Sequence, residues 1–236
     1  LVFDGADITC STGSPVEADA AKNLYITLAD GTVNNITDSR SASDTDAEDN
    51  ADAAVYSECD LIINGTGTLN VTGGYSDGIK SKDDLQIISG IINVKAYDDG
   101  ITGKDSVEIK DGTINSTCAD DGIKSSENDD PEKGYIVVDV GSITVSSDGG
   151  HGFQATYVFV MNDGAVNVTK CNEGIESLNI VQNGGDITIN AADDGLNVSD
   201  KRAASDGNDA ETENSGTDTA DTGDGSGSVT VQNMTY

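Results

Sequence analysis

The chain has 236 residues, with 28 glycines, two prolines, no tryptophan and only three phenylalanines and seven tyrosines. This length suits one domain or two small ones, and so few aromatic residues predict a core of aliphatic side chains. The formal charge of −31 argues against direct binding to nucleic acid, which proteins recognise through clustered Lys and Arg. No apolar run is long enough to span a bilayer, so membrane insertion is not expected.

An acidic-Gly-apolar triplet recurs along the chain with a period of about 22 residues. Its copies are Asp77-Gly78-Ile79, Asp99-Gly100-Ile101, Asp121-Gly122-Ile123, Glu173-Gly174-Ile175 and Asp194-Gly195-Leu196, with a degenerate copy at His151-Gly152-Phe153. A second glycine column keeps the same rhythm at Gly67, Gly90, Gly112, Gly141, Gly164 and Gly185. Both columns lengthen at one place, which indicates that Asn128 to Lys133 are inserted in a turn.

Between the glycines, apolar and polar residues alternate, which is typical of strands. The first strand of each repeat has the predicted inward pairs Leu85/Ile87, Val107/Ile109, Val158/Val160 and Leu178/Ile180. The second has Leu69/Val71, Ile92/Val94, Ile143/Val145, Val166/Val168 and Ile187/Ile189. A third, shorter strand begins at the apolar residue of each triplet. Three strands per repeat, joined by turns in which glycine supplies backbone freedom, predict an all-β fold. This fold is a right-handed parallel β-helix, a three-sided solenoid with about 22 residues per coil and about eight coils.

We expect a single β-helix domain over residues 1–236 that is interrupted by two acidic stretches, at about 38–53 and 199–226. Their low hydrophobicity and high charge predict loops extruded from the coils. The pattern resumes after each loop, with Gly227 to Val231 as one more strand. The four cysteines form no Cys-x-x-Cys pair and are expected to be buried thiols, although the sequence leaves a Cys10–Cys59 pair open.

The acids of the triplets form a column, because stacked coils place equivalent residues about 4.8 Å apart. A second column of Asp98, Asp120, Asn172 and Asp193 lies beside it. Neighbouring carboxylates repel, and each raises its neighbour's pKa unless a cation lies between them. Calcium suits this spacing, whereas the usual Cys and His ligands of zinc are absent.

Asp-Gly is also ordinary turn chemistry, but turns alone do not explain consecutive aspartates in three coils. One calcium site is therefore predicted at Asp98, Asp99, Asp120 and Asp121, with Asp77 contributing. A second is predicted at Asn172, Glu173, Asp193 and Asp194.

Three further residues, Lys80, Thr102 and Lys124, are predicted to face outward beside the acidic column. The lysines either neutralise the carboxylates or contact a sugar. Aromatic surface for sugar rings is expected from Tyr75, Tyr97 and Tyr157. The outward column of the second strand (Asn70, Asn93, Asn115, Thr144, Asn167 and Thr188) suits an extended polar polymer or is plain solvated surface. The only histidine, His151, is expected to be structural, so no catalytic triad is predicted.

Four segments carry a resemblance to a known family: Asp77 to Leu85, Asp98 to Val107, Glu173 to Glu176 and Gly185 to Asn197. They resemble the bacterial cellulose-binding, polysaccharide-lyase-like β-helix family, the carbohydrate-binding domains of clostridial type, and the resemblance extends from about Asp4 to Tyr236. It implies a secreted or surface-attached protein that binds calcium and plant-type polysaccharide without established cleavage. The Asp-Asp-Gly turns would be the calcium ligands. The coil from Asp148 to Gln154 departs from the family pattern, which argues against a cation site at that level.

The sequence thus predicts calcium-dependent, non-catalytic binding of cell-wall polysaccharide, either a β-1,4-glucan such as cellulose or an acidic pectic chain. The alternative is a calcium-dependent, pectate-type lyase in which Lys80 or Lys124 is the base. A third possibility is a purely structural surface stalk. We expect an extracellular or cell-surface-attached monomer, with any export signal preceding the given sequence.

Overall fold

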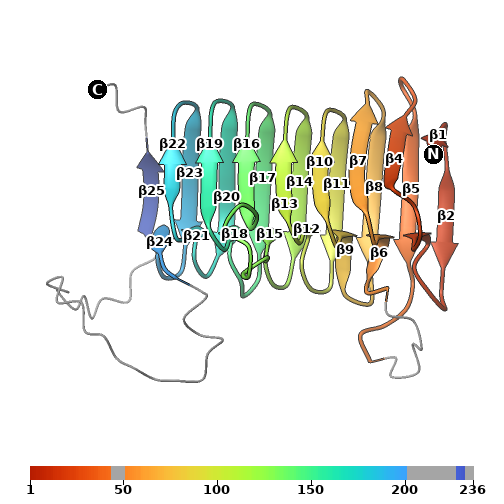
Figure 1. Ribbon diagram of the computed structural model, residues 1–236, viewed down its shortest axis with the longest axis horizontal. Coiled ribbons are helices and arrows are strands. Elements are labelled where there is room, and N and C mark those ends of the chain that lie inside the picture. Colours follow the sequence, from red (N-terminus) through yellow and green to blue (C-terminus); the bar gives the residue numbers. More distant parts are fainter. Residues whose placement is uncertain (44–50, 201–226, 232–236) are drawn as a thin grey trace, which may run out of the picture.

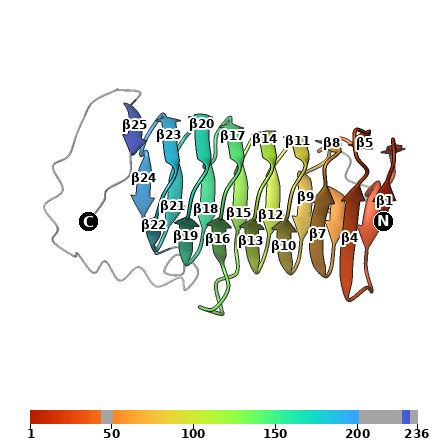
Figure 2. The same ribbon diagram turned by 90° about the horizontal axis from the view of Figure 1, so that it is seen from above.

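The protein is described here from a computed structural model that covers residues 1–43 and 51–200 and the backbone of residues 227–231. The described chain contains only strands and turns, wound into stacked coils with three sides (Figures 1 and 2). This confirms the predicted all-β, three-sided parallel β-helix. In these ranges no helix is long and apolar enough to cross a membrane.

Each side of the coil is one sheet. Sheet A contains β1 (Val2–Phe3), β4 (Asn23–Leu28), β7 (Asp60–Gly65), β10 (Asp84–Ile87), β13 (Ser106–Ile109), β16 (Tyr135–Val138), β19 (Val158–Met161) and β22 (Ile180–Gln182). Sheet B contains β2 (Asp7–Cys10), β5 (Val33–Asp38), β8 (Thr68–Gly73), β11 (Ile91–Ala96), β14 (Thr113–Cys118), β17 (Ser142–Ser147), β20 (Ala165–Cys171), β23 (Asp186–Ala191) and β25 (Gly227–Val231). Sheet C contains β3 (Val16–Ala18), β6 (Ala53–Ser57), β9 (Asp77–Ser81), β12 (Ile101–Gly103), β15 (Ile123–Ser125), β18 (Phe153–Ala155), β21 (Ile175–Ser177) and β24 (Leu196–Val198).

The core is a set of apolar ladders that run along the stack. Leu85 of β10 pairs with Leu61 of β7 on one side and with Val107 of β13 on the other, and all three side chains are fully buried. Alternate residues of each strand point inward in this way because successive side chains of a strand lie on opposite faces. The ladders from the three sheets meet in one continuous cluster, which positions the turns between the sheets.

One predicted inward pair is wrong. In β19 the buried residues are Phe159 and Met161, whereas Val158 and Val160 are only partly buried. A shift of one residue reverses both faces of a strand, and the run Val-Phe-Val-Met is apolar at every position, so alternation could not fix its phase. In the structure Phe159 and Met161 pair with the buried Ile136 and Val138 of β16, and Phe159 packs edge-to-face on Phe153 with ring centroids 5.2 Å apart.

The two glycine columns have different structural causes. Gly90, between β10 and β11, has a φ of 119°, a left-handed conformation that disfavours any side chain. Gly100, in the triplet column, lies outside that region, but an added Cβ would collide with Ser116 Oγ and lie 2.5 Å from Gly122 O of the next coil. The triplet glycines are therefore needed for close stacking and not for the backbone freedom that was predicted.

The two ends of the first acidic stretch pack against the coils. Its residue Arg40 is buried and forms an ion pair with the buried Asp38, 2.7 Å between Nη2 and Oδ2. Ala51 and Ala53 at its far end are also buried. Residues 44–50 and 201–226, the remainder of the two predicted loops, lie outside the described residues.

The strand at Gly227–Val231 exists as predicted, but its direction differs from that of the other strands of its sheet. It pairs antiparallel with β23, whereas every other strand pair of sheet B is parallel. The chain therefore does not add another parallel coil at this point, and β25 borders β23, the last parallel strand of sheet B (Figure 1).

Candidate cation and glycan site

The triplet acids form a buried ladder at the turn between sheets B and C. The side chains of Asp77, Asp99 and Asp121 are all nearly excluded from solvent. In each coil the carboxylate accepts the backbone N–H of the equivalent residue in the next coil: Asp99 N to Asp77 Oδ1 (3.3 Å), Asp121 N to Asp99 Oδ1 (2.9 Å) and His151 N to Asp121 Oδ1 (2.9 Å). The acids are thus part of the turn structure and satisfy backbone donors that would otherwise be buried without a partner.

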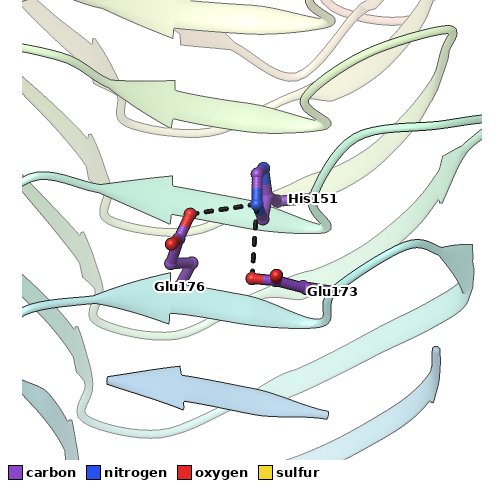
Figure 3. Close-up of side chains that lie close together, drawn as sticks. All are labelled: His151, Glu173 and Glu176. Carbon is purple, nitrogen blue, oxygen red and sulfur yellow. Dashed lines mark ion pairs between the residues drawn. The ribbon is translucent and has the colours of Figure 1, made fainter. Parts of the chain in front are cut away.

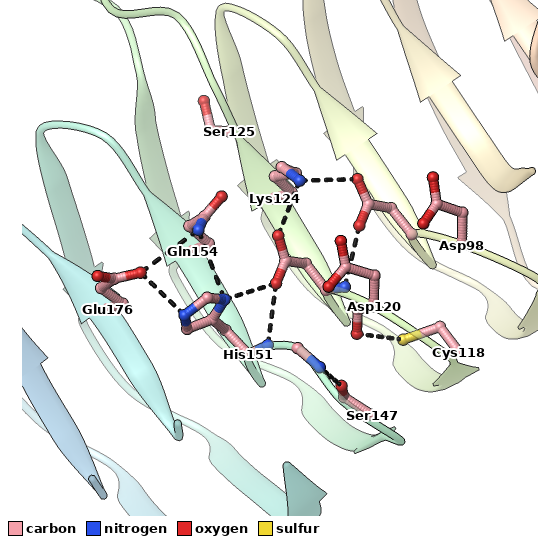
Figure 4. Close-up of polar contacts among 12 residues, drawn as sticks. Asp98, Cys118, Asp120, Lys124, Ser125, Ser147, His151, Gln154 and Glu176 are labelled. Atoms are coloured by element: carbon pink, nitrogen blue, oxygen red, sulfur yellow. Dashed lines mark hydrogen bonds and ion pairs between the residues drawn. The ribbon is translucent and has the colours of Figure 1, made fainter. Parts of the chain in front are cut away.

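Two lysines from sheet C neutralise this ladder. Lys124, which Figure 4 labels, has its Nζ 3.1 Å from Asp99 Oδ2 and 2.8 Å from Asp121 Oδ2. Lys80 Nζ lies 2.9 Å from Asp77 Oδ2 and 2.7 Å from Asp52 Oδ2. Of the two roles considered for these lysines, the geometry matches charge neutralisation.

Burial and these ion pairs separate the acidities of the ladder carboxylates. Burial raises the pKa of Asp99 to about 7, although Lys124 opposes the shift. Burial also acts on Asp121, but the hydrogen bond from His151 and the charge of Lys124 outweigh it and lower the pKa of Asp121 to about 2. Asp121 is therefore the more acidic of the two carboxylates, and a cation near Asp99 would favour its ionised form.

His151 occupies the acidic position of the degenerate coil and contacts three carboxylates there. Its Nδ1 lies 2.7 Å from Asp121 Oδ1, and its Nε2 lies 2.9 Å from Glu176 Oε2 and 3.4 Å from Glu173 Oε2 (Figure 3). Burial disfavours the charged ring, but the hydrogen bond to Asp121 and the charges of Asp121, Glu176 and Glu173 prevail and raise the pKa of His151. The ring is held between carboxylates of two different coils.

Glu176 is a member of this site that sequence reasoning did not select. Its side chain is buried (2% exposed), and it lies in the column of sheet C that also contains Lys124 and Gln154. A detectable signal was present in the sequence. His151 replaces an acid in one column while Glu176 replaces a lysine in the adjacent column one coil later, so the two charges are exchanged.

Two groups of carboxylates remain that bring enough oxygen ligands together for a cation. The ligand oxygens of Asp98, Asp99 and Asp120 lie within 4.8 Å of one another. The same holds for a second group: Glu173, Asp193 and Asp194. Each group joins acids of adjacent coils, as the column argument requires.

The predicted ligands Asp77 and Asp121 are not members of these groups. Lys80, Lys124 and His151 engage their carboxylates, and Lys124 also pairs with Asp99. Asn172 is exposed and directly precedes Glu173. A third group, His151 with Glu173 and Glu176, is already joined by the histidine ion pairs (Figure 3).

The residues predicted to contact sugar differ greatly in exposure. Thr102 is buried (4% exposed), and the ring of Tyr75 is covered by the Arg40 guanidinium, whose Cζ lies 4.6 Å from the ring centroid. Tyr157 is buried and donates its hydroxyl to Asn128 O at 2.8 Å, so it cannot stack on a sugar. Tyr97 is 60% exposed and is the predicted aromatic contact that remains accessible.

The outward column of sheet B uses part of its hydrogen-bonding capacity internally. Asn70, Asn93 and Asn115 each donate a side-chain amide to the asparagine of the preceding coil, at 2.8–2.9 Å, starting from Asn35. This ladder stabilises the stack, and it leaves fewer free groups for an extended polymer than the sequence suggested.

A family model described as a carbohydrate-binding domain-containing protein matches residues 1–227. The chain belongs to this family. A carbohydrate-binding domain-containing protein of Acetivibrio thermocellus is 50% identical over 146 residues, which are 61% of this chain and 51% of the relative. The chain therefore spans about half the length of this curated relative.

A solved structure, described as the polysaccharide lyase-like protein from C. thermocellum in a gadolinium derivative, matches with a TM-score of 0.67 and 30% identity. The match covers 85% of this chain and 75% of that one. These similarities confirm the family to which the sequence motifs pointed.

Proposed function

We propose that the protein binds polysaccharide in a calcium-dependent manner without cleaving it. Membership in a carbohydrate-binding family supports binding, and the solved neighbour is described as only lyase-like. The observation that carries the calcium part is the grouping of Asp98, Asp99 and Asp120 across two adjacent coils.

The donor set of this group fits calcium. Carboxylate oxygens up to 4.8 Å apart can share one ion, because two Ca–O bonds of about 2.3–2.6 Å span that distance. A cation here would also offset the repulsion between stacked acids and favour the ionised form of Asp99.

The lyase alternative finds no support in the lysines assigned to it. A general base must lose its proton near the working pH, which requires a lowered lysine pKa. Burial disfavours the charged forms of Lys80 and Lys124, but their carboxylate partners outweigh it and raise the pKa of both. Each ammonium is therefore held as a cation, and binding without cleavage is the better reading of the site.

We place the protein outside the cell or on its surface, as a monomer, with cellulose-like or pectic polysaccharide as its partner. Three carboxylates with few further protein ligands form an open site, comparable to those of extracellular modules that bind calcium with dissociation constants of about 0.1–1 mM. Such a site would be occupied where calcium is abundant.

Calorimetric titration with calcium tests the cation site. The wild type is expected to bind calcium with a dissociation constant of about 0.1–1 mM. The double variant Asp98→Asn/Asp120→Asn should lose this binding. The matched control, Asp7→Asn/Asp186→Asn, removes the same charge from two exposed positions on β2 and β23 and should bind like the wild type. Equal binding by both double variants would disprove this location.

Sedimentation with insoluble cellulose and with polygalacturonate coupled covalently to beads tests the glycan part. The protein is expected in the pellet with calcium and in solution with a chelator. A protein that stays in solution in every condition would contradict polysaccharide binding and favour a structural stalk. Sustained formation of unsaturated product from polygalacturonate, followed by ultraviolet absorbance, would instead establish a lyase.

A further inference from the structure

A groove of about 380 Å³ lies at the edge where sheet B turns toward sheet C. Its lining includes Thr72, Lys95, Tyr97, Thr117, Ala119 and Asp148, which come from several successive coils. The volume falls at the small end of the range for ligand pockets, which is about 300–1,000 Å³. A single sugar unit of a longer chain suits this size.

The groove offers the side chains that sugar binding requires. Tyr97 contributes a largely exposed aromatic ring, and such a ring packs against the apolar face of a sugar. Thr72 and Thr117 lie on the strands that flank β11, in register with Lys95, and supply hydroxyl groups beside its ammonium. The groove therefore combines one apolar wall with a polar edge.

Lys95 gives this groove a positive charge. In a chain with 12 basic and 43 acidic residues, Lys95 is exposed and makes no ion pair with any residue of the described ranges. The acid in the groove, Asp148, is instead paired with Lys170 at 2.7 Å. The groove thus presents an uncompensated positive charge on a strongly acidic protein.

We propose that this groove binds one uronic-acid unit of an acidic polysaccharide, with the sugar ring against Tyr97 and the carboxylate on the Lys95 ammonium. The proposal rests on the proposed function and names the acidic class of glycan. Tyr97 directly precedes Asp98, and Ala119 directly precedes Asp120, so the groove adjoins the proposed calcium site. A glycan in the groove would reach both the lysine and the cation, which offset its repulsion from the acidic surface.

The test measures the affinity of a short oligogalacturonate and of its methyl ester, in the presence of calcium. The methyl ester keeps the sugar chain and removes the carboxylate charges. Lys95→Gln is expected to weaken oligogalacturonate binding by about fivefold, as for an exposed charge pair, and to leave binding of the methyl ester unchanged. Tyr97→Ala is expected to weaken both ligands by about five- to tenfold.

Two control variants match these changes elsewhere on the surface. Lys82→Gln removes a positive charge at an exposed turn between β9 and β10, and Tyr25→Ala removes an exposed tyrosine from β4. Both should bind like the wild type. If Lys95→Gln and Tyr97→Ala also do so while the wild type binds, the groove assignment is wrong and the proposed function stands.

Two further results have separate meanings. If Lys95→Gln weakens binding of the acid and the ester equally, Lys95 does not contact a carboxylate and the uronic-acid assignment fails. If the wild type binds neither of these ligands nor cellulose, the proposed function itself fails.

Discussion

Replacing Gly100 with alanine tests the close stacking of coils at the candidate site. The added Cβ would collide with Ser116 Oγ and lie 2.5 Å from Gly122 O, a backbone atom that cannot swing away. Gly122 O accepts two hydrogen bonds here, from Ile101 N at 3.2 Å and from Ser116 Oγ at 3.1 Å. Relief of the clash must therefore displace the next coil or break these bonds.

The cost follows from these two effects. Overpacking in a well-packed core costs about 1–3 kcal/mol, and a weakened buried hydrogen bond adds about 1 kcal/mol. We expect Gly100→Ala to lower the free energy of unfolding by about 2–4 kcal/mol, and the melting temperature by roughly 5–15 °C for a chain of this size. Denaturant titration followed by circular dichroism measures the first quantity.

Gly149→Ala is the matched control, because its added Cβ would meet only Ala119 O, at an ordinary contact distance of 3.5 Å. It should change the unfolding free energy by less than about 0.5 kcal/mol. Adding Ser116→Ala to Gly100→Ala should recover part of the loss, since the colliding hydroxyl is removed. If Gly100→Ala is as stable as Gly149→Ala, the stacking argument for the triplet glycines is refuted.

Three further predictions concern other buried groups. Arg40→Met leaves Asp38 as a buried charge without its ion pair and should lower the free energy of unfolding by about 3–5 kcal/mol in the same denaturation assay. The double variant Asp38→Asn/Arg40→Met should restore most of this loss, and no recovery would contradict this reason. The raised pKa of His151 means that its ion pairs stabilise the fold below the pKa of the unfolded chain and lose this effect as the pH rises through the folded pKa. With a chelator present, His151→Gln should therefore cost more stability at about pH 6 than at about pH 9, and an equal cost at both would argue against a charged ring. Cys10 is partly exposed and backbone hydrogen bonds lower its pKa, whereas the other three cysteines are buried. A thiol reagent should therefore label Cys10 first and the other three only on unfolding. Early labelling of a second thiol would disprove that burial.

The candidate site was predictable from the sequence to the extent that it depends on the period of the repeat. The column argument placed Asp98, Asp99 and Asp120 together, and their oxygens do converge. It did not separate these acids from Asp77 and Asp121, because it could not show which carboxylate oxygens converge. That choice depends on side-chain directions within the turn.

Exposure was the second property that the sequence did not determine. Tyr75 and Tyr97 are equivalent as aromatic residues in a repeat, yet one is covered by Arg40 and the other is open to solvent. The covering residue belongs to an acidic stretch whose composition predicted a loop away from the coils. Arg40 is buried there because Asp38 supplies its counter-charge, a pairing that composition does not reveal.

The sequence by itself determined the solenoid, because a repeat of apolar alternation and glycines is a local pattern that each coil repeats and that stacking turns into ladders. Tertiary structure decided which face of β19 is buried, why the triplet positions must be glycine, and which carboxylates remain for a cation. These properties depend on contacts between coils that are about 22 residues apart, which the pattern within one repeat does not show.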